Sequence, residues 1–223
     1  MGFFCGIYKK IIDMEIEEFI SIVKPYTMTS VERIRSLFQS LEYIRKNNIQ
    51  GDIVECGVWK GGNILGCLEY MKHYDINKTV WLYDTFSGMT QTTNFDIDLN
   101  GVSGKQWESK CDCTLQEVKD IIDEKKYPNN KIKFIVGDIT ETLKQNGNIP
   151  KTISLLRLDT DWYESTKIEM ETLYPNLTND GVLIIDDYGH WVGAKKAVDE
   201  YFTLINKKPI FEVIDYTGIK IIK

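Results

Sequence analysis

Five apolar runs alternate with amphipathic stretches along most of the chain. The runs are rich in Val, Ile, Leu and aromatic residues and predict buried strands at 52–58, 79–86, 131–139, 153–159 and 181–187. The stretches between and after them have apolar residues at helical spacing and predict helices at 61–73, 114–126, 140–145, 163–174 and 192–206. Near-continuous apolar strands that alternate with helices are typical of a parallel sheet covered on both faces. The pattern therefore predicts an α/β fold.

The two ends of the chain depart from this alternation. Residues 13–26 and 29–49 have helical spacing, and Thr29 or Ser30 can cap the second helix. At the other end, two short strands meet at Thr217-Gly218. Because a hairpin cannot join parallel neighbours, we expect the last strand to run antiparallel. The sequence thus predicts a helical cap in residues 1–50 and a sheet domain in residues 51–223.

Each predicted strand brings an acidic residue to its carboxyl end, where sheets of this kind bind ligands. These residues are Glu55, Asp84, Asp138, the pair Asp159 and Asp161, and the pair Asp186 and Asp187. A glycine after the first strand, followed by an acid at the end of the second, fits a nucleoside, with Asp84 on the ribose hydroxyls. Gly57 and Gly61 enclose bulky Val58 and Trp59, so the tight turn that a pyrophosphate needs is absent. The acidic rim favours a cationic nucleoside such as S-adenosylmethionine.

The four carboxylates at the ends of the last two strands indicate a divalent cation. Oxygen ligands of this kind suit Mg²⁺, Mn²⁺ or Ca²⁺ rather than zinc. The alternative is helix capping by Asp161 and Asp187, which would explain one acid in each pair but not two.

Several motifs carry a family resemblance. The stretches GDIVECGVWKGGN, YDTFSGM, LRLDTDWYEST, GVLIIDDYGHW and TMTSVERI are similar to those of the macrocin O-methyltransferase family. The resemblance implies a class I methyltransferase fold, a seven-stranded Rossmann-like sheet with an antiparallel last strand. It also implies methyl transfer from S-adenosylmethionine to sugar hydroxyls with the help of Mg²⁺. The family's metal ligands fall on Asp159, Asp186 and Asp187, and its proposed base on Asp159 or Asp161.

The strand ends and the resemblance together define a set of candidate site residues. The cofactor set is Thr27, Met28, Glu55, Gly57, Trp59, Gly61, Asn63, Asp84, Thr85, Phe86, Asp138, Ile139 and Asp159. The catalytic candidates are Asp159, Asp161 and His190. His190 is either a second candidate base or a loop residue packed beside Trp191. The long polar segment 87–113 is expected to act as a lid and to contact the acceptor.

Composition and charge argue against nucleic-acid-binding, membrane-spanning and disulfide-bonded classes of protein. The net charge of −6 argues against nucleic-acid or anionic-membrane partners. No apolar run approaches the length of a membrane span. Five cysteines at irregular spacing, Cys5 among them, fit reduced thiols, so we expect a cytoplasmic protein. A homo-oligomer is compatible with the helices before residue 50.

Three other functions share parts of the pattern. A catechol-type O-methyltransferase would use the same cofactor and metal on an aromatic diol. A nucleotide-sugar glycosyltransferase would use Asp159-Thr160-Asp161 as a metal motif but would leave Gly57 and Asp84 without a role. A non-catalytic scaffold on the same fold would have no need for the acids.

Overall fold

The computed structural model describes residues 13–123 and 128–223, so Cys5 lies outside the described residues. Seven strands form one sheet in the order β3-β2-β1-β4-β5-β7-β6. Their bounds are Asp52–Cys56 (β1), Val80–Asp84 (β2), Ile132–Val136 (β3), Ile153–Leu158 (β4), Leu177–Ile185 (β5), Glu212–Val213 (β6) and Ile219–Ile222 (β7). The pairs among β1 to β5 are parallel, whereas β7 runs antiparallel to both β5 and β6. The predicted sheet and its antiparallel last strand are confirmed.

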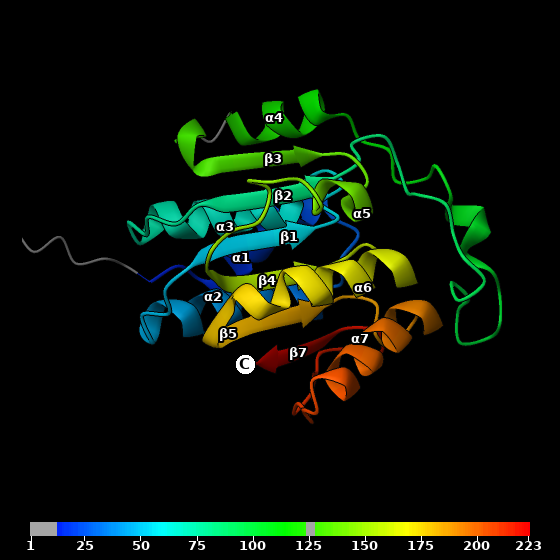
Figure 1. The fold of residues 1–223 in the computed structure, drawn as a ribbon. Coiled ribbons are helices and arrows are strands. Elements are labelled where there is room, and N and C mark those ends of the chain that lie inside the picture. The colour runs from blue at the N-terminus through cyan, green and yellow to red at the C-terminus, as the bar shows by residue number, and fades with distance from the viewer. Residues whose placement is uncertain (1–12, 124–127) are drawn as a thin grey trace, which may run out of the picture.

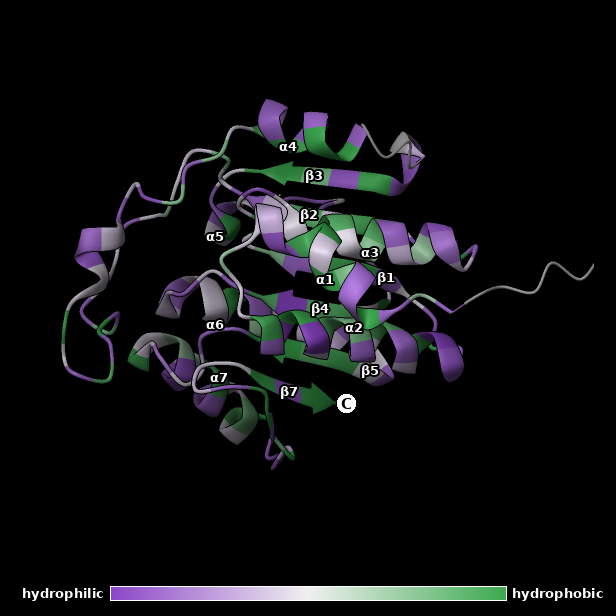
Figure 2. Cartoon of the chain, turned by 180° about the vertical axis from the view of Figure 1, so that it is seen from behind, coloured by the Kyte–Doolittle hydropathy of each residue, from purple (hydrophilic) through white to green (hydrophobic). Residues whose placement is uncertain are grey.

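Helices cover both faces of the sheet (Figure 1). One face carries α1 (Ile16–Val23), α2 (Val31–Lys46) and α3 (Gly62–His73), which Figure 2 shows in front of the strands. The other face carries α5 (Ile139–Thr142), α6 (Tyr163–Thr172) and α7 (Val192–Leu204). The helix α4 (Leu115–Asp123) lies beside β3, and short 3₁₀ turns occupy Lys24–Tyr26, Gly104–Trp107, Asn129–Lys131 and Tyr174–Asn176. None of the described helices is long and apolar enough to cross a membrane.

The helix α2 follows directly from its sequence. The Ser30 hydroxyl accepts a hydrogen bond from the Arg33 N–H at 3.1 Å, which caps the first turn. Its apolar stripe is buried in the core that also holds strand residues such as Ile53 and Val182. Residues 31–46 therefore form part of the layer that covers the sheet and bring Arg33 to the edge where the acids lie.

Two of the boundaries that differ from the predicted ones have a clear physical cause. The strand β5 begins at Leu177, four residues before the expected start at 181, because buried Leu177 pairs with Ile153 of β4 before a register irregularity. The predicted helix 13–26 becomes α1 followed by a 3₁₀ turn, because Pro25 cannot continue the α-helical hydrogen bonds.

The segment 87–113 crosses the carboxyl edge of the sheet and is pinned by Asp96 (Figure 1). Asp96 is fully buried, and its Oδ1 accepts the N–H of Tyr163 at the start of α6 at 2.7 Å. Its Oδ2 accepts the N–H and hydroxyl of Thr93 at 2.6 and 2.8 Å. The N–H of Val192, at the start of α7, donates to the Ile97 carbonyl at 3.0 Å. The segment 87–113 is therefore held by hydrogen bonds against the first residues of α6 and α7.

The close packing of Gly193 against Asp96 allows a test of how much this attachment of the segment 87–113 contributes to stability. A Cβ at Gly193 would collide with Asp96 Oδ1, the atom that holds Tyr163. We expect Gly193→Ala to lower the free energy of unfolding by about 1–3 kcal/mol, the usual cost of overpacking. Denaturant unfolding of Gly193→Ala, Asp96→Ala and the double variant measures this. If the two single effects simply add, the collision is not the cause.

Candidate active site

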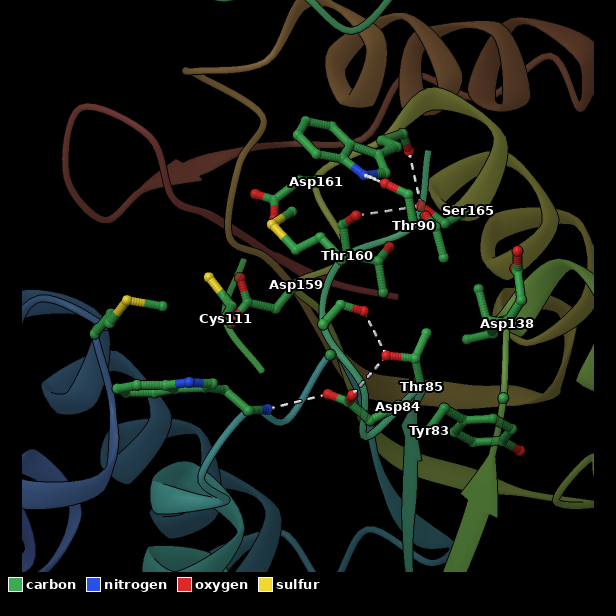
Figure 3. A pocket seen from close by; sticks show the side chains of 18 residues that line it. Tyr83, Asp84, Thr85, Thr90, Cys111, Asp138, Asp159, Thr160, Asp161 and Ser165 are labelled. Carbon is green, nitrogen blue, oxygen red and sulfur yellow. Dashed lines mark hydrogen bonds between the residues drawn. The ribbon is translucent and has the colours of Figure 1, made fainter. Parts of the chain in front are cut away.

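A cavity opens where the strand order reverses, between β1 and β4 (Figure 3). It encloses about 730 Å³ of empty space, part of it open to solvent. The predicted residues that line it are Met28, Gly57, Trp59, Asp84, Thr85, Asp138, Ile139, Asp159 and Asp161. This volume and this place in the sheet suit a nucleoside-sized ligand.

Asp84 organises the turn after β1. Its Oδ2 accepts the N–H groups of Val58 and Trp59 at 2.8 and 3.1 Å, and its Oδ1 accepts that of Phe86 at 2.8 Å. The backbone of Trp59 has a positive φ of 45°, which is uncommon for a bulky residue and is held by these bonds. Asp84 thus lines the cavity and also holds the backbone of Val58 and Trp59, the second of which lines the cavity too.

Gly57 is required by packing between strands. Its φ is +78°, and a Cβ there would collide with the carbonyl of Asp159. The absence of a side chain at Gly57 therefore lets the ends of β1 and β4 come close together, and this brings Asp159 to the cavity.

Five predicted cofactor residues do not line the cavity. They are Thr27, Glu55, Gly61, Asn63 and Phe86. Glu55 and Asn63 are buried, and the Asn63 amide donates to Glu55 Oε1 at 3.1 Å and to Thr29 Oγ1 at 3.3 Å. Burial raises the pKa of Glu55 to about 7. These two residues belong to a buried hydrogen-bond network with Thr29 and Arg157.

The remaining three have local structural roles. Thr27 donates its hydroxyl to Thr29 Oγ1 at 2.8 Å. Gly61, with a φ of +78°, precedes the first residue of α3. Phe86 packs against Phe134 with ring centroids 6.3 Å apart.

Three carboxylates converge at one side of the cavity. Asp159, Asp161 and Asp187 each offer an oxygen, and these oxygens all lie within 4.8 Å of one another. Burial, followed by the charge of Asp159, raises the pKa of Asp161 to about 7. Burial, followed by the charge of Asp161, also raises the pKa of Asp187. Asp187 Oδ2 is buried and receives no hydrogen bond from the described residues. Among the described residues, the ion-pair partner of this group is Arg157, whose Nη1 lies 2.7 Å from Asp159 Oδ2.

Asp186, a predicted metal ligand, lies outside this cluster. One of its oxygens contacts the guanidinium of Arg157 and the other contacts that of Arg33. Its exposed side-chain fraction is 5%, so both contacts are shielded from water. The oxygens of Asp159, Asp161 and Asp187 thus lie within 4.8 Å of one another, whereas the predicted ligand Asp186 contacts two arginines.

Comparison with known proteins identifies the family. A model of the macrocin-O-methyltransferase family (TylF) matches residues 23–222. The chain belongs to this family. Over 208 residues the methyltransferase is 30% identical to a demethyldecarbamoylnovobiocin O-methyltransferase of Streptomyces niveus, covering 87% of this chain and 74% of that protein. Over 181 residues it is 28% identical to a mycinamicin III 3''-O-methyltransferase of Micromonospora griseorubida, covering 79% and 70%.

The solved structures agree with this assignment. The O-methyltransferase NovP matches with a TM-score of 0.76 at 28% identity, covering 89% of this chain and 82% of that one. The calicheamicin methyltransferase CalS11, at 17% identity and a TM-score of 0.68, shares the fold. The present protein is an O-methyltransferase, which confirms the function class expected from the sequence.

Trp191 orients Asp161 in the methyltransferase. The indole N–H of Trp191 donates to Asp161 Oδ1 at 3.0 Å, and the ring of Trp191 packs edge to face on Trp162 at 5.0 Å. Asp161 itself has a positive φ of 65°. The positive φ and the directed hydrogen bond hold this carboxylate beside the cavity.

His190 does not line the cavity. Its ring packs on Trp191 at 4.7 Å and lies 6.1 Å from the ring of Tyr216. Of the two possibilities for His190, a second candidate base or a loop residue packed beside Trp191, these contacts match the second.

A second hollow adjoins the cavity. Its lining shares Met28, Trp59 and Cys111 with the cavity and adds Lys60, Gln106, Trp107, Lys110 and Asp112. Four of the added residues come from the segment 87–113. Cys111, which has a positive φ of 58°, lines both the cavity and the hollow and lies near Asp159 (Figure 3).

Sequence reasoning assigned no role to Arg157 and did not place Trp191 on Asp161. A signal for Arg157 was present, because an arginine inside the apolar run SLLRLD must find buried acids. The contact between Trp191 and Asp161 joins residues thirty positions apart and had no local signal.

Proposed function

We propose that this methyltransferase moves the methyl group of S-adenosylmethionine to a hydroxyl group of a sugar-containing acceptor, assisted by a divalent cation. The observation that carries the proposal is the acid cluster at the side of a nucleoside-sized cavity. The names of the relatives support the acceptor class, because they include enzymes that act on mycinamicin and on a rhamnosyl tetracenomycin. The acceptors that fit this proposal are glycans, nucleotide sugars and glycosylated metabolites.

The cofactor would lie across the carboxyl ends of β1, β2 and β4. Asp84 would accept the ribose hydroxyls, since a carboxylate has further lone pairs beside the backbone N–H groups it already holds. Asp138 and Ile139 would lie beside the adenine ring of the cofactor. The acids Asp159 and Asp161 would face the cationic sulfonium. When bound, this cofactor supplies an electrophilic methyl group.

The residues present fit a divalent cation. Oxygens of Asp159, Asp161 and Asp187 converge, and Asp187 Oδ2 is buried without a donor. Hard oxygen donors favour Mg²⁺, or Mn²⁺ and Ca²⁺. When bound, such a cation supplies Lewis-acid chemistry that lowers the pKa of a nearby hydroxyl.

Asp161 is the proposed base. A general base works best with a pKa near the working pH, and burial raises the pKa of Asp161 to about 7. Trp191 holds one carboxylate oxygen and thereby orients the other. In the reaction the hydroxyl oxygen forms the new C–O bond, the C–S bond breaks to leave a neutral thioether, and Asp161 takes the proton.

The acceptor would enter through the second hollow, where Trp59 and Trp107 offer apolar faces and Lys60 and Gln106 offer donors. The catechol-type alternative differs only in what this hollow accepts. The glycosyltransferase alternative gives no role to Asp84 at the cavity.

The test combines binding and turnover. Titration calorimetry should show binding of S-adenosylhomocysteine and none of nucleotide sugars in its place. Methyl transfer from labelled S-adenosylmethionine is then screened on sugar and catechol acceptors with Mg²⁺ and with a chelator. Binding of a nucleotide sugar in the cofactor cavity, or transfer to catechols alone, would overturn the proposal.

The ribose contact of Asp84 can be measured by itself. We expect Asp84→Ala to weaken binding of S-adenosylmethionine by about 1–3 kcal/mol, because hydrogen bonds to charged groups are worth roughly that much. Loss of the support for Val58 and Trp59 acts in the same direction. Calorimetry gives the affinity, and Asp138→Ala is the companion variant at the next strand end. Unchanged affinity in Asp84→Ala would rule out the ribose role.

A further inference from the structure

Glu169 is a buried acid to which the proposed reaction gives no part. It lies on α6 and is 0% exposed, and its neighbour Met170 belongs to the core that also holds Leu158 of β4. Among the described residues, no lysine or arginine forms an ion pair with Glu169, and its Oε2 is buried without a hydrogen-bond partner. Burial of such a carboxyl is costly, whereas a leucine would pack there without that cost. Stability alone therefore does not account for the acid.

The side chain of Glu169 makes one hydrogen bond within the described part of the chain, and its partner is Thr160. The Thr160 hydroxyl donates to Glu169 Oε1 at 2.9 Å. Thr160 stands between Asp159 and Asp161 and lines the cavity with them (Figure 3). The bond therefore joins the buried face of α6 to the turn that carries both acids.

The turn after β4 is attached to α6 through two groups of Thr160. Its carbonyl accepts the N–H of Trp162 at 2.7 Å, just before the helix begins, and its hydroxyl reaches Glu169 inside the core. The next residue, Asp161, has a positive φ of 65°, which is uncommon for a residue other than glycine. A side-chain bond into the core restricts rotation of this turn, and it therefore restricts how far the two carboxylates on either side of Thr160 can move.

Glu169 can hold the turn without adding a charge to it. Burial raises the pKa of Glu169 well above its ordinary value, and the hydrogen bond from Thr160, which lowers the pKa, does not offset this. The charges of Asp159 and Asp161 raise it further. A neutral carboxyl keeps its hydrogen-bonding oxygens, and it does not repel the nearby acids as a carboxylate would.

We propose that Glu169 is a positioning residue for methyl transfer: through the Thr160 hydroxyl, it fixes the turn that presents Asp159 and Asp161 to the cavity. This inference rests on the function proposed for those two acids. Glu169 does not line the cavity, so its effect on the reaction passes through Thr160.

The experiment compares Glu169→Leu with Met170→Ala, a change at the adjacent core position, which is also 0% exposed. Mg²⁺ affinity comes from the melting temperature as a function of Mg²⁺ concentration, S-adenosylhomocysteine affinity from calorimetry, and kcat from an acceptor found by the screen described above. Glu169→Leu should melt close to the unaltered protein, because an apolar side chain can replace an uncompensated buried acid.

The two variants should differ in function in the opposite sense. We expect Glu169→Leu to weaken Mg²⁺ binding by about fivefold or more and to lower kcat by about tenfold or more, because small displacements of catalytic groups are costly. Its affinity for S-adenosylhomocysteine should stay within about threefold of the unaltered protein. Met170→Ala should melt clearly lower, because it leaves a cavity, yet keep its Mg²⁺ affinity and kcat within about threefold.

Thr160→Val tests the same bond from its other end and does not depend on Glu169→Leu being folded. Valine keeps the branched shape but lacks the hydroxyl, so this variant should show the same losses as Glu169→Leu. The double variant should be worse than either single variant by no more than about threefold, since both changes break one bond. Glu169→Gln, which is neutral and can still accept the hydroxyl, should keep its Mg²⁺ affinity and kcat within about threefold.

Three results would overturn the role of Glu169. They are unchanged Mg²⁺ affinity and kcat in Glu169→Leu, equal functional losses in Met170→Ala, and losses in Thr160→Val and Glu169→Leu that multiply in the double variant. Failure of the proposed function itself is recognised separately, because the unaltered protein would then bind neither Mg²⁺ nor S-adenosylhomocysteine.

Discussion

Asp161→Asn is expected to lose nearly all turnover while keeping the cofactor. General-base catalysis contributes about 10²–10⁴-fold to a rate, and asparagine cannot accept the proton. The amide keeps the shape of the side chain and can still accept the indole N–H of Trp191. The affinity for S-adenosylhomocysteine should therefore change little, because the cofactor contacts lie mainly on β1 and β2. Steady-state kinetics and calorimetry on the same preparation separate the two effects.

His190→Gln is the control for this prediction. His190 packs on Trp191 and does not line the cavity, so we expect this variant to retain most of its activity. The pH dependence adds a second measurement. At low Mg²⁺ concentration, kcat/KM of the unaltered protein should rise with pH as Asp161 ionises, because burial raises its pKa to about 7 when no cation is bound. A residual rate in Asp161→Asn close to that of the unaltered protein would exclude Asp161 as the base, and a large loss in His190→Gln would favour His190 instead.

The sheet was predictable because its signals are local. Each apolar run marks a strand, although β3 is only partly buried, and the two ends of the chain show their helix cap and hairpin within a few residues. The convergence of acids was also predictable, since parallel strands deliver their carboxyl ends to one edge. What the sequence could not resolve was which acids face one another across that edge.

The case of Asp186 and Asp187 shows why. Successive residues at the end of a strand point to opposite faces of the sheet. Asp186 points toward the α2 side, where Arg33 and Arg157 meet it, while Asp187 joins Asp161. Two neighbours that look like a pair in sequence therefore have different partners. The partner of Asp186 could not be predicted locally, because Arg33 lies 153 positions away in the sequence.

Removal of divalent cations is expected to make the protein's stability depend strongly on pH. Burial and mutual repulsion raise the pKa of Asp161 to about 7 and also raise that of Asp187, whereas a free aspartate has a pKa of about 3.9. A carboxyl whose pKa is raised in the folded state contributes stability below its unfolded pKa and loses it as pH rises through the folded value. In chelator, the melting temperature should therefore fall between about pH 5.5 and pH 8.

Mg²⁺ should remove most of this fall, because it replaces the protons that the cluster otherwise needs. At a concentration of about 100 times its Kd, a ligand that binds only the folded state adds about 2.7 kcal/mol of stability. For a chain of this length, this corresponds to a rise in melting temperature of about 5–10 °C at pH 8. The rise should be smaller at pH 5.5, where protons compete with Mg²⁺.

The variant Asp187→Asn tests whether the carboxylates of Asp159, Asp161 and Asp187 cause this dependence of the melting temperature on pH and Mg²⁺. With one charge removed, the chelated variant should be more stable at pH 8 than the chelated unaltered protein, and its gain from Mg²⁺ should shrink. Turnover should be largely lost as well, with cofactor affinity nearly unchanged. Asp180→Asn, which removes an exposed charge at the other end of β5, should leave both the pH dependence and the Mg²⁺ effect intact. If chelation leaves the melting temperature unchanged at pH 8 and Asp187→Asn keeps full turnover, the three carboxylates do not hold a cation. Capping of α6 by Asp161 would not replace that account, because the N-cap of α6 makes no side-chain hydrogen bond and the Tyr163 N–H donates to Asp96.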